Sequence, residues 1–151
     1  MSVGIGYDSH RFAEGRRLVL GGVEVEHARG LAGHSDADVL THAVIDALLG
    51  AAGQGDIGTL FPDDDEAWHD ADSIDLLRTA VGTVAGRIVN IDATLICEEP
   101  RIGPLRAEME RILAETTSAR VSVKATTNEG MGWIGRGEGI ACIAVAAVDS
   151  D

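Results

Sequence analysis

The stretch GHSDADVLTHAVIDALLG, residues 33–50, contains the clearest helix of the chain, and the rest of the fold can be built around it. Its apolar residues recur at helical spacing, at Val39, Leu40, Ala43, Val44, Ala47 and Leu48. Ser35 is expected to cap the N-terminus, and two aspartates in the first turn place negative charge where the helix dipole favours it. Gly50 and Gly53 are expected to end the helix.

Strand patterns surround this helix in the sequence. Residues 3–8 alternate apolar with small or polar side chains, and residues 18–20 and 23–26 flank Gly21-Gly22 as a β-hairpin. Further strands are predicted over 88–97, 121–125 and 140–148, and further helices over 73–84 and 104–115. We therefore expect an α/β fold of the α+β sandwich kind, in which helices pack on one face of a mixed β-sheet. The whole chain, residues 1–151, is expected to form a single domain.

The chain is strongly acidic, with 25 acidic against 12 basic residues and a net charge of −13. Such a surface repels nucleic acid and anionic lipid, so neither is expected as a partner. The longest apolar run, residues 140–148, is too short to span a bilayer, and the N-terminus carries no secretory signal pattern. We therefore expect a cytoplasmic protein, in which Cys97 and Cys142 are reduced, buried thiols.

A metal site is the first candidate for chemistry. Asp8 and His10 are two residues apart on a predicted strand, so their side chains share a face, and His42 lies on the predicted helix. Two histidines and one carboxylate form a three-ligand zinc site with an open fourth position. Asp46, one turn after His42, is expected to accept the second ring N–H of that histidine. A capped Asp/His pair and a solvated helix face are the alternatives to a metal site.

Two loops could contact an anionic ligand. The run Asp63-Asp64-Asp65 is either a solvated acidic loop or a loop that becomes ordered around a cation or a hydroxyl-rich ligand. In KATTNEGMGWIGRGEG, residues 124–139, two threonines end a strand and glycines follow. Backbone N–H groups and hydroxyls of this kind can hold phosphates, and Glu129 could supply an oxygen ligand to magnesium. A tight hairpin is the alternative for this segment.

Seven segments, in order along nearly the whole chain, resemble the 2-C-methyl-D-erythritol 2,4-cyclodiphosphate synthase family. They are GYDSHRF (6–12), GHSDADV (33–39), HAVIDALLG (42–50), GDIGTLFPD (55–63), ADS (71–73), KATTNE (124–129) and GRGEGIA (135–141). The resemblance implies a phosphorus–oxygen lyase of the non-mevalonate isoprenoid pathway. It would convert 4-diphosphocytidyl-2-C-methyl-D-erythritol 2-phosphate to the cyclodiphosphate and CMP. Because the attacking phosphate is already anionic, positioning and charge neutralisation would dominate catalysis.

The resemblance also implies roles for individual residues. Asp8, His10 and His42 would hold Zn²⁺ or another divalent transition metal, and Glu129 would hold Mg²⁺ or Mn²⁺. His34 and Thr127 would be the catalytic groups that hydrogen-bond charge developing in the transition state. Substrate would contact Asp8, Ser9, His10, His34, Ser35, Asp56, Ile57, Gly58, Phe61, Asp63, Asp65, Cys97, Pro100, Arg101, Ile102, Gly103, Thr126, Thr127, Asn128, Glu129, Trp133 and Arg136. Of these, the segment 97–103 and the two threonines would form the cytidine pocket.

Family members are homotrimers around a threefold axis with active sites between subunits, so the same assembly is implied here. Trp133, Arg136 and Glu138 would line a central channel, where an isoprenoid diphosphate binds in some members. Three residues depart from the common pattern, which has phenylalanine at Trp133, lysine at Arg101 and threonine at Asn128.

We expect a stand-alone synthase rather than the form fused to a cytidylyltransferase. Two other functions remain open. A zinc phosphohydrolase would use the same three ligands to activate water, and a non-catalytic trimeric binding protein would bind without turnover.

Overall fold

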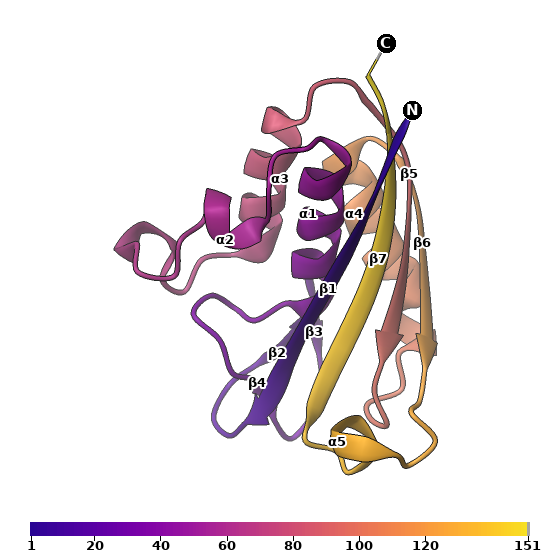
Figure 1. Ribbon diagram of the computed structural model, residues 1–151. Coiled ribbons are helices and arrows are strands. Elements are labelled where there is room, and N and C mark those ends of the chain that lie inside the picture. Colours follow the sequence, from indigo (N-terminus) through magenta and orange to yellow (C-terminus); the bar gives the residue numbers. More distant parts are fainter. Residues whose placement is uncertain (151) are drawn as a thin grey trace.

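A computed structural model describes residues 1–150 and shows an α+β fold in which helices cover one face of a curled, mixed sheet (Figure 1). The sheet has five strands in the order β4-β1-β7-β5-β6. These strands are β1 Ser2–Ala13, β4 Gly30–Leu31, β5 Arg87–Ile96, β6 Arg120–Thr126 and β7 Gly139–Asp149. Only the β5–β6 pair is parallel among these neighbours. The hairpin of β2 (Leu18–Leu20) and β3 (Val23–Val25) forms a separate two-stranded sheet.

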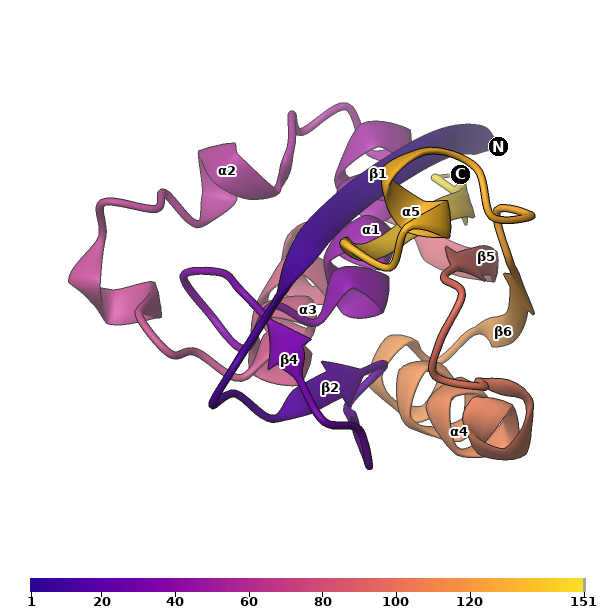
Figure 2. The same ribbon diagram turned by 90° about the horizontal axis from the view of Figure 1, so that it is seen from below.

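Three longer helices form the layer beside the sheet (Figures 1 and 2). They are α1 Val39–Ala51, α3 Ser73–Thr83 and α4 Arg106–Thr117. Shorter elements are the helices α2 Ile57–Leu60 and α5 Gly132–Gly135 and the 3₁₀ turns η1 Glu66–Trp68 and η2 Gly103–Leu105. Within residues 1–150, every helix is too short or too polar to cross a membrane.

Helix α1 packs unusually close to strand β1. A Cβ atom added at Gly4 would lie 2.1 Å from the carbonyl oxygen of Ala47, and one at Gly6 would lie 2.0 Å from that of Ala43. Glycine is therefore required at both positions, because any side chain would overlap the helix backbone. The close approach places the next residues of β1, including Asp8 and His10, over the first turns of α1.

The start of α1 corrects the predicted cap. The helix begins at Val39 and Asp38 is its N-cap, whereas Ser35 lies in the preceding loop. The Asp38 carboxylate accepts hydrogen bonds from the backbone N–H and the hydroxyl of Thr41 and from the N–H groups of Gly21 and Gly22. Ser35 cannot be the cap because Ala37 has a φ of +56°, which places a turn between it and the helix.

Most predicted elements are confirmed within a few residues. The Gly21-Gly22 turn has φ values of +60° and +77°, as a two-residue hairpin turn requires. Two short helices were not predicted from the sequence pattern: α2 precedes the acidic run Asp63–Asp65, and α5 interrupts the glycine-rich segment. Cys97 and Cys142 are free and buried, as expected.

The face of the sheet that points away from the helices carries exposed apolar side chains. Val3, Ile5 and Tyr7 of β1 are 66%, 70% and 56% exposed, and Ile143 and Val145 of β7 are 39% and 38% exposed. The register pairs Ile5 with Val145 and Tyr7 with Ile143, so these side chains form one patch. A continuous apolar patch on a sheet is typical of a surface that another protein chain covers.

Candidate active site

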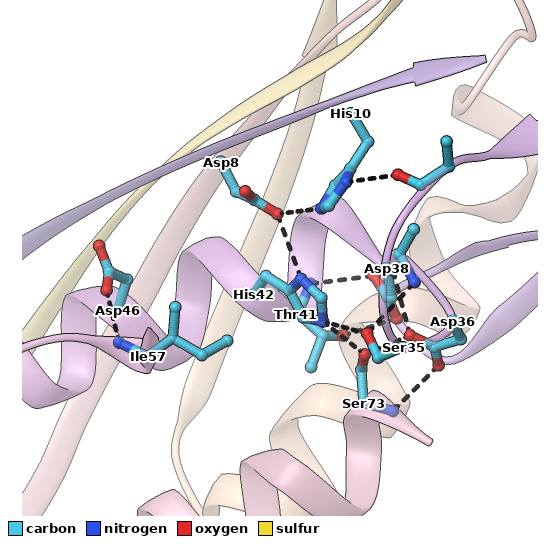
Figure 3. Close-up of polar contacts among 12 residues, drawn as sticks. Asp8, His10, Ser35, Asp36, Asp38, Thr41, His42, Asp46, Ile57 and Ser73 are labelled. Atoms are coloured by element: carbon cyan, nitrogen blue, oxygen red, sulfur yellow. Dashed lines mark hydrogen bonds and ion pairs between the residues drawn. The ribbon is translucent and has the colours of Figure 1, made fainter. Parts of the chain in front are cut away.

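Strand β1 and helix α1 bring the three predicted metal ligands together (Figure 3). Oδ2 of Asp8 lies 2.8 Å from Nε2 of His10 and 3.3 Å from Nδ1 of His42. One ligand atom from each residue lies within 4.8 Å of the other two, so a single cation placed among them could reach all three. The predicted cluster of Asp8, His10 and His42 is therefore confirmed as a possible metal site, and its donor set fits a divalent transition metal.

Each imidazole is anchored to the protein through the nitrogen that faces away from Asp8. Nδ1 of His10 donates to the carbonyl oxygen of Ala32 at 2.8 Å, which leaves Nε2 directed at Asp8. Nε2 of His42 lies 2.8 Å from the Ser73 hydroxyl and 3.1 Å from the Ser35 hydroxyl, which leaves Nδ1 directed at Asp8. Anchored rings of this kind present one nitrogen to a metal in a fixed orientation.

The protonation of the cluster suits a cation. Burial alone would raise the pKa of Asp8, but hydrogen bonds with His10 and His42 outweigh it and lower that pKa. Burial likewise opposes charge on His10, and the neighbouring Asp8 carboxylate more than offsets it, so the pKa of His10 is raised. The carboxylate is thus ionised at neutral pH, and a cation would replace the proton that Asp8 and His10 otherwise hold between them.

The role predicted for Asp46 is wrong. Oδ1 of Asp46 accepts the backbone N–H of Ile57 at 3.0 Å, and both hydrogen-bond partners of His42 Nε2 are serine hydroxyls (Figure 3). Side chains on a helix lean toward its N-terminus, so the far end of the His42 ring lies over the preceding turn and away from Asp46. Asp46 instead fixes the start of α2.

A cavity of about 320 Å³ opens beside the metal cluster. Its lining includes Asp8, His10, His34, Ser35, His42, Ile57, Gly58, Phe61 and Asp63, all of which were predicted to belong to the site. Trp68 and Leu76 also line it and were not predicted. Trp68 packs edge-on against Phe61, with ring centroids 4.8 Å apart, so the two rings form an apolar part of the lining.

Two of the predicted acidic residues have local roles outside this lining. Asp56 caps α2 and accepts hydrogen bonds from the hydroxyl and the N–H of Thr59, which lower its pKa. Asp65 caps η1 through the N–H of Ala67. Both carboxylates therefore stabilise the short elements of the loop that borders the cavity.

The residues predicted to hold cytidine gather in a second cavity, of about 480 Å³. It is lined by Cys97, Glu98, Pro100, Arg101, Ile102, Gly103, Pro104, Ala125, Thr126 and Thr127. Strands β1 and β6 are three positions apart in the sheet order, or about 14 Å along the sheet at the usual strand spacing, so the two cavities lie at different strands. We name these two cavities the metal cavity and the cytidine cavity after the roles predicted for their residues, and they share no lining residue.

Glu98, which the sequence did not single out, organises the loop that contains Glu129. Its Oε1 accepts the backbone N–H groups of Asn128 at 3.0 Å and of Gly130 at 3.1 Å. Between them Glu129 has a φ of +53° and an exposed side chain. Only the fold reveals this role, because no spacing pattern relates residue 98 to residues 128–130.

Ser9, Trp133 and Arg136 line neither of these two cavities. They line a third cavity, of about 660 Å³, together with residues that include His10, Arg11 and Arg29. Ser9 faces this cavity because successive strand residues point to opposite faces, so its side chain is turned away from those of Asp8 and His10. Arg136 pairs with Glu138 at 2.7 Å at the same place.

Comparisons with known proteins agree with this geometry. A model of the YgbB family matches residues 1–149. The 2-C-methyl-D-erythritol 2,4-cyclodiphosphate synthase of Symbiobacterium thermophilum is 58% identical, over 98% of both chains. The structure of the bifunctional IspDF from Campylobacter jejuni matches 96% of this chain, and 41% of its own, with a TM-score of 0.92 and 41% identity. A 2C-methyl-D-erythritol-2,4-cyclodiphosphate synthase in its CDP-bound form matches 97% of this chain and 99% of its own, with a TM-score of 0.87 and 35% identity.

Proposed function

The chain belongs to the YgbB family, and on that premise we propose that it converts 4-diphosphocytidyl-2-C-methyl-D-erythritol 2-phosphate to 2-C-methyl-D-erythritol 2,4-cyclodiphosphate and CMP. The observation that carries the proposal is the cluster of Asp8, His10 and His42 in a cavity whose lining includes other residues predicted to contact substrate. We propose that the whole chain acts as one domain in this reaction.

The reaction is an internal phosphoryl transfer. An oxygen of the 2-phosphate attacks the β-phosphorus and forms a new P–O bond, while the bond from the β-phosphorus to the bridging oxygen breaks. CMP leaves with that oxygen and its electron pair. Since the nucleophile is an anion that needs no deprotonation, the protein has to hold the two phosphates close and in line.

Two metal ions fit the residues present. Asp8, His10 and His42 would hold zinc, and Glu129 would hold magnesium with the substrate phosphates as further ligands. When bound, these ions supply positive charge that neutralises the phosphate oxygens in a chain that otherwise carries a net charge of −13. Local cations are needed because the overall field of the protein repels a phosphorylated substrate.

The remaining site residues bind and orient the substrate. The Ser35 hydroxyl and the His34 side chain line the cavity beside the metal cluster, where they would donate to a phosphate. Gly58 lines the same cavity and Asp56 caps the helix α2 that contains it, and both would contact the erythritol part. Thr127, which lines the cytidine cavity, would hydrogen-bond phosphate oxygens as charge develops on them. Loss of one such donor typically costs about 3–4 kcal/mol of transition-state stabilisation.

Assembly into a homotrimer would join the two cavities into one active site. The apolar patch of Val3, Ile5, Tyr7, Ile143 and Val145 is the surface that a second copy would cover. A threefold arrangement of such sheets would bring the metal cavity of one subunit to the cytidine cavity of its neighbour. The cavity that holds Trp133 and Arg136 would then lie beside the axis, where Arg136 offers a cation to an isoprenoid diphosphate.

Phosphorus NMR of the purified protein with substrate and magnesium tests the reaction directly. We expect equal amounts of CMP and a cyclic diphosphate, and no product from the His42→Ala variant. Inorganic phosphate in place of the cyclic product would instead establish a phosphohydrolase. Tight binding of a cytidine nucleotide without turnover would leave a binding protein.

A further inference from the structure

The outer nitrogen of His42 begins a chain of hydrogen bonds that ends on a carboxylate. Nε2 of His42 lies 2.8 Å from Oγ of Ser73, and the Ser73 hydroxyl donates to Oδ1 of Asp36 (Figure 3). The other oxygen of Asp36 accepts the backbone N–H of Ser73 at 2.9 Å. Ser73 is fully buried and is the first residue of α3, so these hydrogen bonds tie α1, the helix that carries His42, to the start of α3.

The donor and acceptor in each of these hydrogen bonds follow from the chemistry of the three groups. An ionised carboxylate only accepts hydrogen bonds, so the single proton of the Ser73 hydroxyl is directed at Asp36. The Ser73 oxygen can then only accept from His42, which places a proton on Nε2. When a cation lies between His42 and Asp8, this proton on Nε2 leaves the lone pair of the neutral imidazole on Nδ1, directed at the cation.

Ser35 also contacts Nε2 of His42 but differs from Ser73 in two ways. Its oxygen is farther away, at 3.1 Å, and it lines the substrate cavity, which Ser73 does not. Its own proton has no carboxylate acceptor among the hydrogen bonds of residues 1–150. Ser35 thus keeps a proton that it can donate to a bound phosphate. The Ser73 hydroxyl instead donates its proton to Asp36 and accepts from His42.

We propose that Ser73 and Asp36 are positioning residues for the metal site, which fix the tautomer and the orientation of His42 so that Nδ1 faces the cation. The inference rests on the proposed function for the metal itself. It differs from a simple cap of α3, a role that the Asp72 carboxylate already fills by accepting the N–H of Ile74.

The direction of the hydrogen bonds from His42 through Ser73 to Asp36 can be tested by substitution. Oδ1 of Asp36 also accepts the backbone N–H of Asp38 at 3.1 Å, and Oδ2 accepts that of Ser73. In Asp36→Asn an amide NH₂ at the position of Oδ1 donates to the Ser73 oxygen, which frees the hydroxyl proton to point at His42. Nε2 would then accept, and the proton would move to Nδ1, where it blocks the metal. This nearly isosteric change should therefore be as harmful to metal binding as Ser73→Ala. Ser73→Thr keeps the hydroxyl and should restore binding.

The experiment measures Zn²⁺ and Co²⁺ dissociation constants by chelator competition, without substrate, together with the melting temperature of each metal-free protein. We expect Ser73→Ala and Asp36→Asn to weaken metal binding about 10–100-fold. Ser73→Thr and the matched control Ser35→Ala should stay within about threefold of wild type. In the zinc-loaded wild type, long-range ¹H–¹⁵N spectra should place the His42 proton on Nε2.

Metal affinities unchanged in Ser73→Ala and Asp36→Asn, with only the melting temperature lowered, would overturn the inference, because the residues would then be structural caps. A proton on Nδ1 of His42 in the zinc-loaded protein would overturn it as well. A wild-type protein that binds neither metal would instead refute the proposed metal centre. The two failures are thus distinguishable.

Discussion

The Asp38 carboxylate accepts the backbone N–H of Gly21 at 2.8 Å, and this contact joins the β2–β3 turn to the first residue ahead of helix α1. The same carboxylate accepts the N–H of Gly22 and both the N–H and the hydroxyl of Thr41. Burial and the nearby Asp36 carboxylate raise the pKa of Asp38, and the backbone donors oppose that rise. The Asp38 carboxylate is therefore held in the protein interior by hydrogen bonds that two separate elements provide.

Removing this carboxylate should be costly. Asp38→Ala leaves the buried donors of Gly21, Gly22 and Thr41 without a partner and deletes the cap of α1. We expect the free energy of unfolding, measured by urea denaturation, to fall by about 3 kcal/mol or more. Asp75→Ala removes an exposed ion pair with Arg78 and should change it by less than about 0.5 kcal/mol. Equal effects of the two changes would contradict the role given to Asp38.

Alanine substitutions at two glycines, one packed against α1 and one exposed on α3, should have opposite effects on stability. Gly6→Ala forces a methyl group into the carbonyl oxygen of Ala43, so we expect a loss of about 3 kcal/mol or more in the free energy of unfolding. Gly82→Ala, on an exposed turn of α3 with nothing within 4 Å, should raise it by about 0.5–1 kcal/mol. Thermal unfolding of the two variants measures both effects. A tolerated Gly6→Ala would mean that strand and helix can separate without loss.

The Cys97 thiol gives a prediction about pH. Burial, with the Glu98 carboxylate beside it, raises the pKa of Cys97 to about 11. Because the thiolate is the reactive form, native Cys142→Ala protein should react slowly with a disulfide reagent at pH 8, and the rate should keep rising above pH 9. A thiol in the unfolded chain loses its proton first, so the free energy of unfolding should decrease as the pH rises above about 9. A rate that levels off near pH 8.5 would contradict this pKa.

The sequence predicted those features whose signal is local. The two-residue turn at Gly21-Gly22, the helical spacing of residues 39–48 and the paired Asp8 and His10 each follow from a short pattern, and the structure has all three. The error at Asp46 arose because spacing on a helix gives the face of a side chain but not the direction in which its far atoms lean.

The missing features depend on contacts between distant segments. Ser73 meets His42 across 31 residues of sequence, and Glu98 meets Asn128 across 30. Each is a polar residue that comes within hydrogen-bond distance of its partner only when the helices and strands have packed. The segment that holds Ser73 did belong to the motifs that carried the family resemblance, so the resemblance marked the residue without giving its role.

The separation of the metal cavity from the cytidine cavity leads to a prediction about assembly. His42→Ala damages only the metal cavity, and Thr127→Ala damages only the cytidine cavity. If each active site combines the metal cavity of one subunit with the cytidine cavity of the next, every mixed trimer contains one site with two intact halves. Equal amounts of the two variants, unfolded together and refolded, should therefore recover about one quarter of wild-type activity, since about three quarters of the trimers are mixed.

The same mixture separates this arrangement from a site built within one chain. If a single chain carried a complete site, every site in the mixture would contain one of the two substitutions. The activity of the mixture would then stay at the level of the separate variants. Ile5→Glu places a charge in the apolar patch, where Ile5 is 70% exposed in the single chain. When Ile5→Glu is added to both variants, it should abolish the recovery of activity and give a monomer in sedimentation, because a charge buried at the interface would have no partner. Recovery that survived this change would place the contact between subunits on another surface.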